Sequence, residues 1–231
     1  MSELMNLLSR QMERSTAGSE DTARRVMQMC GRISAGKALF CGDDLFTPRL
    51  IVESTGAAVT AAFHEDFRVE AAERAGLNAL SAGIYEIPVM EGGWDFVWYN
   101  GGAEPDGVTR RLEQFHGSLK KGAVAVYRTL CWLIDPSPDT KCYAERRFGR
   151  PEPLDRVVRE AKECGFDILD FYISPKTDWT EGLYRPITEL IRKYEGSDEE
   201  TAGIGEINKE IYMFNLHSEE YSYVYYILRC K

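Results

Sequence analysis

The sequence predicts a single α/β domain in which helices pack on both faces of a mainly parallel β-sheet. Short apolar runs rich in Val, Ile, Phe and Tyr alternate with amphipathic helical patterns along most of the chain, which is the pattern of successive βαβ units. The length of 231 residues fits one domain with an elaboration. The content of 44% hydrophobic and 28% charged residues is typical of a globular protein.

Four consecutive parts make up this one domain. We expect N-terminal helices in residues 1–35, the α/β core in residues 36–174, a helical insertion or cap in residues 175–220 and the last strand in residues 221–231. The first part contains apolar spacing over residues 4–12 and a second helix after Ser19. Ser19 is suited to the N-cap position and Gly31 to ending the second helix.

The core alternates strands with helices. Its expected strands are 38–42, 57–63, 77–82, 94–99, 123–129 and 166–173, and its expected helices are 47–55, 65–75, 109–119 and 154–164. Thr47 is expected to cap its helix because Pro48 follows at the first helical position. The last strand is dense in aromatic residues, which favour β-structure.

The insertion interrupts this alternation. A helix is expected where Ile187, Leu190, Ile191 and Tyr194 share one face. Residues 195–220 carry eight acidic residues against one basic residue, and this composition favours a solvated helical face. A long insertion beside the carboxyl ends of the strands would alternatively suit a substrate cap.

Charge and cysteine usage argue against several classes of function. The 28 basic and 37 acidic residues give a formal net charge of −9, which is unsuited to binding the phosphate backbone of nucleic acid. No apolar run reaches the roughly 18 residues that span a bilayer. The six cysteines form no C-x-x-C pair and only three histidines are present, so we expect no metal site and reduced thiols in a cytoplasmic protein. A homodimer is expected to use the N-terminal helices or the last strand.

Six short motifs follow one another along the chain. They are GSEDT at 18–22, WDFVW at 94–98, LKKGA at 119–123, WLID at 132–135, the segment 175–186 with Trp179 and Tyr184, and YVYYI at 223–227. In this order they resemble class I S-adenosylmethionine-dependent methyltransferases over nearly the whole chain. The resemblance implies a Rossmann-like seven-stranded sheet with one antiparallel strand, S-adenosylmethionine as cofactor and a small-molecule substrate.

The chain departs from this family's pattern where the cofactor is expected. Members usually carry an acid in the first strand and then a G-x-G-x-G loop, whereas this chain has Phe40 and then GDDLF at 42–46. Glycines there let backbone N–H groups approach a ligand. Asp43 and Asp44 add bulk and negative charge, and they can occupy the helix N-terminus themselves. At the end of the second strand, Phe63 replaces the acid that receives the ribose hydroxyls, and a phenyl ring accepts no hydrogen bonds.

The expected cofactor site nevertheless lies at the carboxyl ends of the strands, where open α/β sheets bind ligands. The residues that the resemblance places there are Gly42, Asp43, Asp44, Phe63, His64, Gly83, Ile84 and Tyr99. His64 or Glu65 would receive the ribose in a shifted register. His64 is also the candidate catalytic base, because histidine titrates near neutral pH.

The expected acceptor site uses a second group of residues. Asn100 is a candidate catalytic residue that orients an acceptor hydroxyl or amine, and an ordinary turn residue is the alternative. Trp132, Trp179 and Tyr184 are candidates for an aromatic substrate pocket, and ordinary packing explains them equally well. The adjacent Arg146 and Arg147 fit a solvated surface, with an anionic substrate clamp as the lesser alternative.

Three functions therefore remain open from the sequence. The first is S-adenosylmethionine-dependent methyl transfer to a small molecule. The second is a degenerate member that no longer binds the cofactor and acts as a binding or partner subunit. The third is an enzyme that keeps the fold and binds a different ligand in the same cleft.

Overall fold

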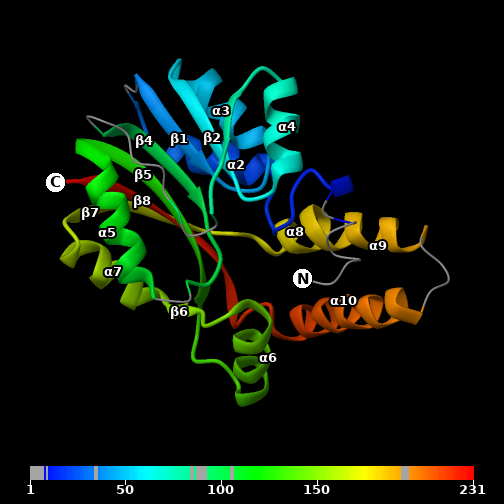
Figure 1. Cartoon of the computed structure of the whole chain (residues 1–231). Coiled ribbons are helices and arrows are strands. Elements are labelled where there is room, and N and C mark those ends of the chain that lie inside the picture. Colours follow the sequence, from blue (N-terminus) through cyan, green and yellow to red (C-terminus); the bar gives the residue numbers. More distant parts are fainter. Residues whose placement is uncertain are drawn as a thin grey trace.

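An eight-stranded sheet, with seven strands in one continuous order and a short eighth strand beside them, forms the centre of the molecule in the computed structural model (Figure 1). The structure describes residues 8, 10–33, 36–83, 86, 93–104, 107–193 and 198–231, the side chains of 198–202 excepted. The strands are β1 (Lys37–Cys41), β2 (Ala58–Phe63), β3 (Asn78–Ser81), β4 (Trp94–Asn100), β5 (Leu119–Trp132), β7 (Phe166–Ile173) and β8 (Tyr221–Cys230), and a short β6 (Glu152–Pro153) pairs with β5. Their order is β3-β2-β1-β4-β5-β8-β7. In the described sheet only β8 runs antiparallel to its neighbours, so the predicted topology class is confirmed.

Helices cover both faces of this sheet. They are α2 (Glu20–Met29), α3 (Phe46–Thr55), α4 (Asp66–Arg74), α5 (Val108–Ser118), α6 (Pro138–Phe148), α7 (Leu154–Glu163), α8 (Lys176–Trp179), α9 (Arg185–Ile191) and α10 (Asp198–His217), with a π-helical turn at Thr180–Tyr184. α2, α3 and α4 pack on one face, and α5 and α7 pack on the other. As expected, Ser19 caps α2, because its Oγ accepts the N–H of Thr22 at 3.1 Å.

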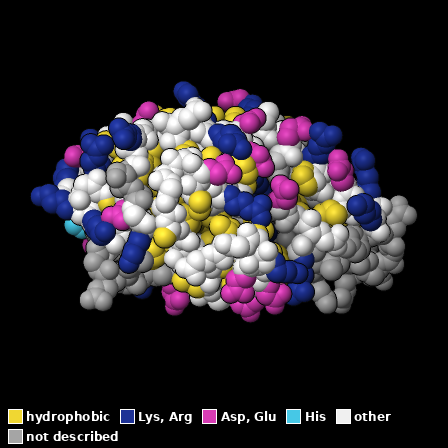
Figure 2. Space-filling view, turned by 90° about the horizontal axis from the view of Figure 1, so that it is seen from above, with side chains coloured by type: hydrophobic (Ala, Val, Ile, Leu, Met, Phe, Trp, Pro, Cys, Tyr) yellow, Lys and Arg dark blue, Asp and Glu magenta, His cyan; other side chains and the backbone are white. Residues whose placement is uncertain are grey.

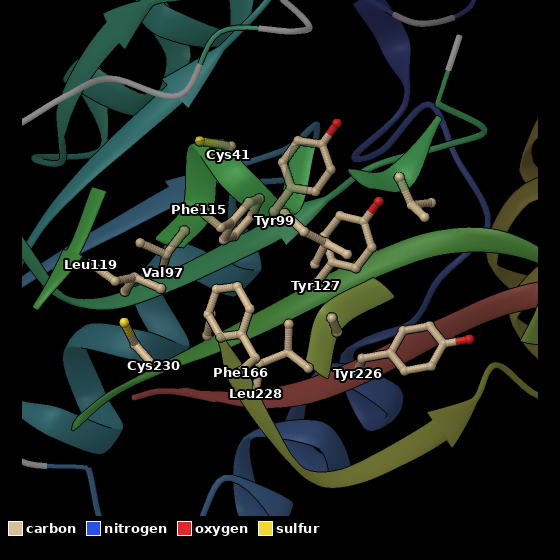
Figure 3. Close-up of a cluster of buried hydrophobic side chains, with 14 of the residues drawn as sticks. Cys41, Val97, Tyr99, Phe115, Leu119, Tyr127, Phe166, Tyr226, Leu228 and Cys230 are labelled. Atoms are coloured by element: carbon tan, nitrogen blue, oxygen red, sulfur yellow. The ribbon is translucent and has the colours of Figure 1, made fainter. Parts of the chain in front are cut away.

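Each face of the sheet carries one apolar core. On the α5 side, the rings of Tyr99 and Tyr127 stack with centroids 5.8 Å apart, and Phe115 meets both edge to face (Figure 3). On the α3 side, Phe40 and Trp98 are fully buried. The strands β4, β5 and β8 are buried on both faces. Their sequences therefore read as apolar runs and not as strict alternation.

The segment between β7 and β8 forms a helical lobe beyond one end of the sheet (Figure 1). Its core is Trp179, whose ring stacks between Phe214 and Tyr223 with centroids 4.8 and 5.0 Å away. α10 confirms the expectation of a helix in the acidic stretch, and Glu206 is exposed there. Glu210 is the exception, because it is only 5% exposed and faces the lobe's core.

Several sequence predictions are corrected by the structure. α3 begins at Phe46, so Thr47 lies inside the first turn and its N–H donates to Asp44, which supplies the cap. β5 begins at Leu119 and not at residue 123, because Leu119 pairs with Trp94 on β4. The helix α6 is not predicted by periodicity, since few of its positions are apolar. The expected helix at residues 4–12 lies largely outside the described residues. Tyr194, which was expected at the end of the helix in the insertion, also lies outside them.

The last strand lies in the interior of the sheet. β8 pairs with β5 along one edge and with β7 along the other, and nearly all of its residues are buried. It therefore offers no free edge for a second copy of the chain.

On the face seen from above, Figure 2 shows acidic and basic side chains interspersed with apolar atoms. No described helix is long and apolar enough to cross a membrane.

Candidate functional site

A cavity of about 320 Å³ opens at the carboxyl ends of β1, β2 and β4. One half is lined by the turns that follow the strands, at residues 41–43, 62–65, 82–83, 86 and 99–102. The other half is lined by Arg147 and Phe148 of α6 and by residues of the helical lobe and β8, namely Trp179, Leu183, Ile187, Glu210 and Tyr223. Met12, Ser15 and Thr16 close it from the N-terminal side. The cavity therefore joins the expected cofactor side to the expected acceptor side.

Gly42 makes the turn after β1 possible. A Cβ atom at this position would lie 2.4 Å from Cζ of Phe40 and 3.1 Å from Cβ of Asn100. The ring of Phe40 lies directly under the turn, where family members carry an acid. Only glycine fits above that ring, so packing alone explains the glycine at this position.

Asp44 points into the protein and does not line the cavity. Its Oδ1 accepts the N–H of Thr47 at 2.7 Å, and its Oδ2 accepts the Thr47 hydroxyl and the Nδ2–H of Asn100, both at 3.1 Å. Burial raises the pKa of Asp44, while the charge of Arg14 opposes the shift. The carboxylate thus occupies the N-terminus of α3, as the sequence suggested, but its bulk is not in the ligand space.

Asn100, the last residue of β4, connects Asp44 to Trp98 of the same strand. Its Oδ1 accepts the indole N–H of Trp98 at 2.8 Å, while its Nδ2 donates to Asp44. The side chain also lines the cavity. These bonds fix the direction of the amide, so any contact with an acceptor uses its remaining N–H or lone pair. The catalytic assignment of Asn100 stays a prediction.

The end of β2 places three consecutive side chains differently. Phe63 is 1% exposed and meets Phe40 edge to face with centroids 6.0 Å apart. His64 is exposed on the cavity wall. Glu65 is half-buried on the same wall, with Oε2 3.7 Å from Nε of Arg68. Glu65 is therefore the carboxylate that the end of β2 offers to the cavity.

The turn after β3 contributes backbone and one further carboxylate. The N–H of Gly83 donates to Oε2 of Glu86 at 3.1 Å, and both residues line the cavity. The sequence did not point to Glu86. Ile84 lies outside the described residues.

Tyr99 and Cys41 form the floor of the cavity. The hydroxyl of Tyr99 donates to Oε1 of Glu104 at 2.9 Å, and Glu104 pairs with Arg111 at 3.4 Å. Burial raises the pKa of Tyr99 well above its usual value and that of the Cys41 thiol to about 12. Both groups are therefore protonated at neutral pH, and Cys41 is no nucleophile there.

The N-terminal segment is bonded to the strand ends. The N–H of Ser15 donates to Oδ2 of Asp43 at 2.7 Å. Arg68 donates to the carbonyl of Glu13 and to the Ser15 hydroxyl, at 3.0 and 2.6 Å. Asp43 lines the cavity as predicted, but one of its oxygens is already engaged by the protein.

Arg128 on β5 also binds the N-terminal segment to the strand ends. This residue is fully buried, and it donates to the Ala17 carbonyl at 2.9 Å, the Thr16 hydroxyl at 2.9 Å and the Gly101 carbonyl at 3.1 Å. Its guanidinium also lies 4.2 Å from the ring centre of Tyr223. The sequence offered one signal, a charged residue inside an otherwise apolar strand, which in a folded protein requires partners.

The helical lobe brings only part of the predicted aromatic pocket to the cavity. Trp179 lines it, with its indole N–H donating to Ser222 at 3.2 Å. Trp132 and Tyr184 do not line the cavity. Trp132 packs against Tyr221, and the hydroxyl of Tyr184 donates to Glu210 at 3.3 Å. Arg147, whose partner is Glu210 at 2.6 Å, lines it instead. No cluster of metal ligands occurs among the described residues.

Solved structures resemble this fold over its whole length, although neither a family model nor a curated protein matches the sequence. YjhP from E. coli superposes with a TM-score of 0.80 at 12% identity, covering 99% of each chain. A SAM-dependent methyltransferase from Thiobacillus denitrificans, solved with S-adenosyl-L-homocysteine, gives 0.79 at 11% identity and covers 100% of this chain and 99% of its own. A SAM-dependent methyltransferase from Geobacter sulfurreducens, also solved with S-adenosyl-L-homocysteine, gives 0.76 at 10% identity with 98% coverage of each chain. The strand order, the single antiparallel strand and these similarities together show that the chain has the class I methyltransferase fold.

Proposed function

We propose that this protein transfers a methyl group from S-adenosylmethionine to a small molecule. The observation that carries the proposal is one continuous cavity that runs from the strand ends to the helical lobe. A methyl transfer needs donor and acceptor held together in one water-poor space. The volume of about 320 Å³ is at the lower end of the range for small-molecule sites.

The residues on the strand side fit the donor with altered contacts. Glu65 offers a carboxylate that would accept the ribose hydroxyls, in place of the family's acid at the position of Phe63. The backbone at Gly83 and at Gly101 lies against the cavity. The N-terminus of α3 is already capped by Asp44, so the methionyl end would depend on other donors. When bound, S-adenosylmethionine supplies an electrophilic methyl group for in-line displacement.

The chain's own residues position the acceptor. Phe148 and Trp179 provide apolar wall and exclude water. Asn100, held by Trp98 and Asp44, offers a fixed amide at the junction of the two halves. His64 lies exposed on the wall, where an imidazole would take the proton released by the acceptor.

A degenerate protein that no longer binds S-adenosylmethionine is the second candidate. Phe40 and Phe63 pack against each other at both positions where the family carries acids, and Asp44 fills the helix N-terminus. These three features remove contacts that the cofactor uses elsewhere in the family. They are the specific observations in favour of a binding or partner subunit.

Calorimetric titration with S-adenosylmethionine and with S-adenosylhomocysteine separates the two candidates. We expect micromolar binding, reduced at least tenfold by Glu65→Gln. Glu70→Gln is the matched control, because Glu70 is an exposed acid on α4, the helix that directly follows Glu65, and does not line the cavity. If folded protein binds neither ligand, the methyltransferase proposal fails and the degenerate alternative replaces it.

A further inference from the structure

We propose that the methyl acceptor is a small apolar or aromatic carboxylate, and that Arg147 binds its carboxylate group. The inference rests on the proposed function, because it takes the α6 and helical-lobe half of the cavity as the acceptor site. It also names a specificity-determining residue. Arg147 is the one Arg or Lys among the described residues that line the cavity.

The geometry of Arg147 leaves a donor edge available. Its Nε donates to Oε2 of Glu210 at 2.6 Å, and its guanidinium carbon lies 5.4 Å from the ring centre of Phe148. The described contacts use only the Nε–H, while the side chain keeps 38% of its surface exposed. The two terminal amino groups therefore remain to bind a ligand. Glu210 and the Phe148 ring hold the guanidinium plane in one orientation.

The sign of the ligand's charge follows from how Glu210 is used. This carboxylate is 5% exposed, and its two oxygens already accept from Arg147 and from the hydroxyl of Tyr184. A cationic ligand would compete with both bonds. The terminal amino groups of Arg147 only donate, so a ligand that binds them must supply acceptors. A carboxylate matches the planar fork of arginine with two parallel hydrogen bonds.

The wall around Arg147 defines the rest of the ligand. Phe148, Trp179, Leu183, Ile187 and Tyr223 face this half of the cavity. Both faces of the Trp179 ring are covered, by Phe214 and Tyr223, so it presents an edge and not a stacking face. The other acidic lining residues, Asp43, Glu65 and Glu86, belong to the strand-end turns. An anion with an apolar body is thus suited to the half that contains Arg147.

Ligand-observed NMR with matched acids and amides tests this assignment. The probes are benzoate, phenylacetate, 3-phenylpropionate and indole-3-acetate, each against its own neutral amide, with the whole 231-residue chain. We expect at least one acid to bind tenfold or more tightly than its amide. If no acid of the panel is preferred over its amide, the inference is wrong.

Two variants assign the preference to this side chain. Arg147→Gln alone would leave Glu210 buried without its cation, so the double variant Arg147→Gln/Glu210→Gln removes the pair together, and we expect it to abolish the preference for the acid. Arg147→Lys keeps the charge but loses the fork, so a reduction of threefold or more is expected. Arg146→Gln is the matched control, since this neighbour on α6 is exposed and does not line the cavity. An acid preference that survives both Arg147 substitutions would overturn the assignment.

Titration of the same samples with S-adenosylhomocysteine distinguishes a failure of the proposed methyl transfer from a failure of the anion site. If S-adenosylhomocysteine does not bind but the acid preference depends on Arg147, the proposed methyl transfer fails and the anion site stands. If S-adenosylhomocysteine binds and no acid is preferred, the anion site alone fails.

Discussion

The rings of Phe40 and Phe63 meet edge to face at the carboxyl ends of two adjacent parallel strands, β1 and β2, with centroids 6.0 Å apart. In the family that the chain resembles, both positions usually hold acids. The two phenylalanines contact each other, so the two departures form one packing unit. Gly42 lies directly over this unit, which links the remaining glycine of the motif to the same pair.

Phe63→Asp is therefore expected to destabilise the protein and not to restore a ribose contact. The substitution would bury an unpaired carboxylate beside the Phe40 ring, and removing a large buried aromatic side chain costs about 3–5 kcal/mol. Urea denaturation measures the change in unfolding free energy. Phe63→Leu is the control and is expected to cost less. A Phe63→Asp variant as stable as the parent would show that the pair contributes no packing.

Asp44→Ala is expected to lower stability by about 2 kcal/mol, because it removes the cap of α3 and the acceptor of Asn100. Asp44→Asn keeps an acceptor for the Thr47 N–H, so we expect a smaller loss. Chemical denaturation ranks the two variants. Equal losses would mean that the charge or the bond from Asn100, and not the cap, carries the contribution.

Arg128→Gln is expected to release the N-terminal segment from the strand ends. The shorter amide cannot reach the Thr16 hydroxyl and the carbonyls of Ala17 and Gly101 together. Hydrogen–deuterium exchange followed by peptide mass spectrometry should show faster exchange in residues 10–18 and little change in β1. Uniform acceleration across the whole sheet would instead indicate global destabilisation.

Asp95 gives the protein a stabilising contribution that disappears in acid. The ammonium of Lys120 at 2.7 Å, aided by the N–H groups of Lys37 and Gly36, holds the pKa of Asp95 below its usual value of 3.8. A carboxyl with a lowered folded-state pKa stabilises the fold above its unfolded pKa, and this stabilisation is lost as pH falls through the folded pKa. The stability difference between the parent and Asp95→Asn should therefore be full above about pH 5 and shrink steadily below about pH 4. Thermal unfolding at pH 7, 5 and 3 measures it, and a difference that grows in acid would contradict the sign.

The fold was predictable because its determinants are local. Buried strands such as β4 and β8 are apolar runs, and helix ends at Ser19 and Gly31 follow from capping chemistry. The helix α6 was missed because its inward positions, Tyr143 and Ala144, are too few to give a period.

The site was less predictable because its contacts join distant parts of the chain. Arg128 acts on residues more than 100 positions away, and only the strand register places it beside Asn100. Glu210 lies within an acidic stretch, where composition favours solvent exposure. Its spacing from the inward-facing Ile207 and Phe214 was the available signal that it faces the core.

The attachment of residues 13–17 to Asp43, Arg68 and Arg128 has a practical consequence for biochemistry on this protein. Shortened forms lacking these residues would lose one wall of the cavity, and three charged side chains would each lose at least one hydrogen-bond partner. Weak or absent ligand binding by such a form would then reflect the loss of this cavity wall and not a property of the intact site. Purification tags at that end are best separated from it by a flexible spacer.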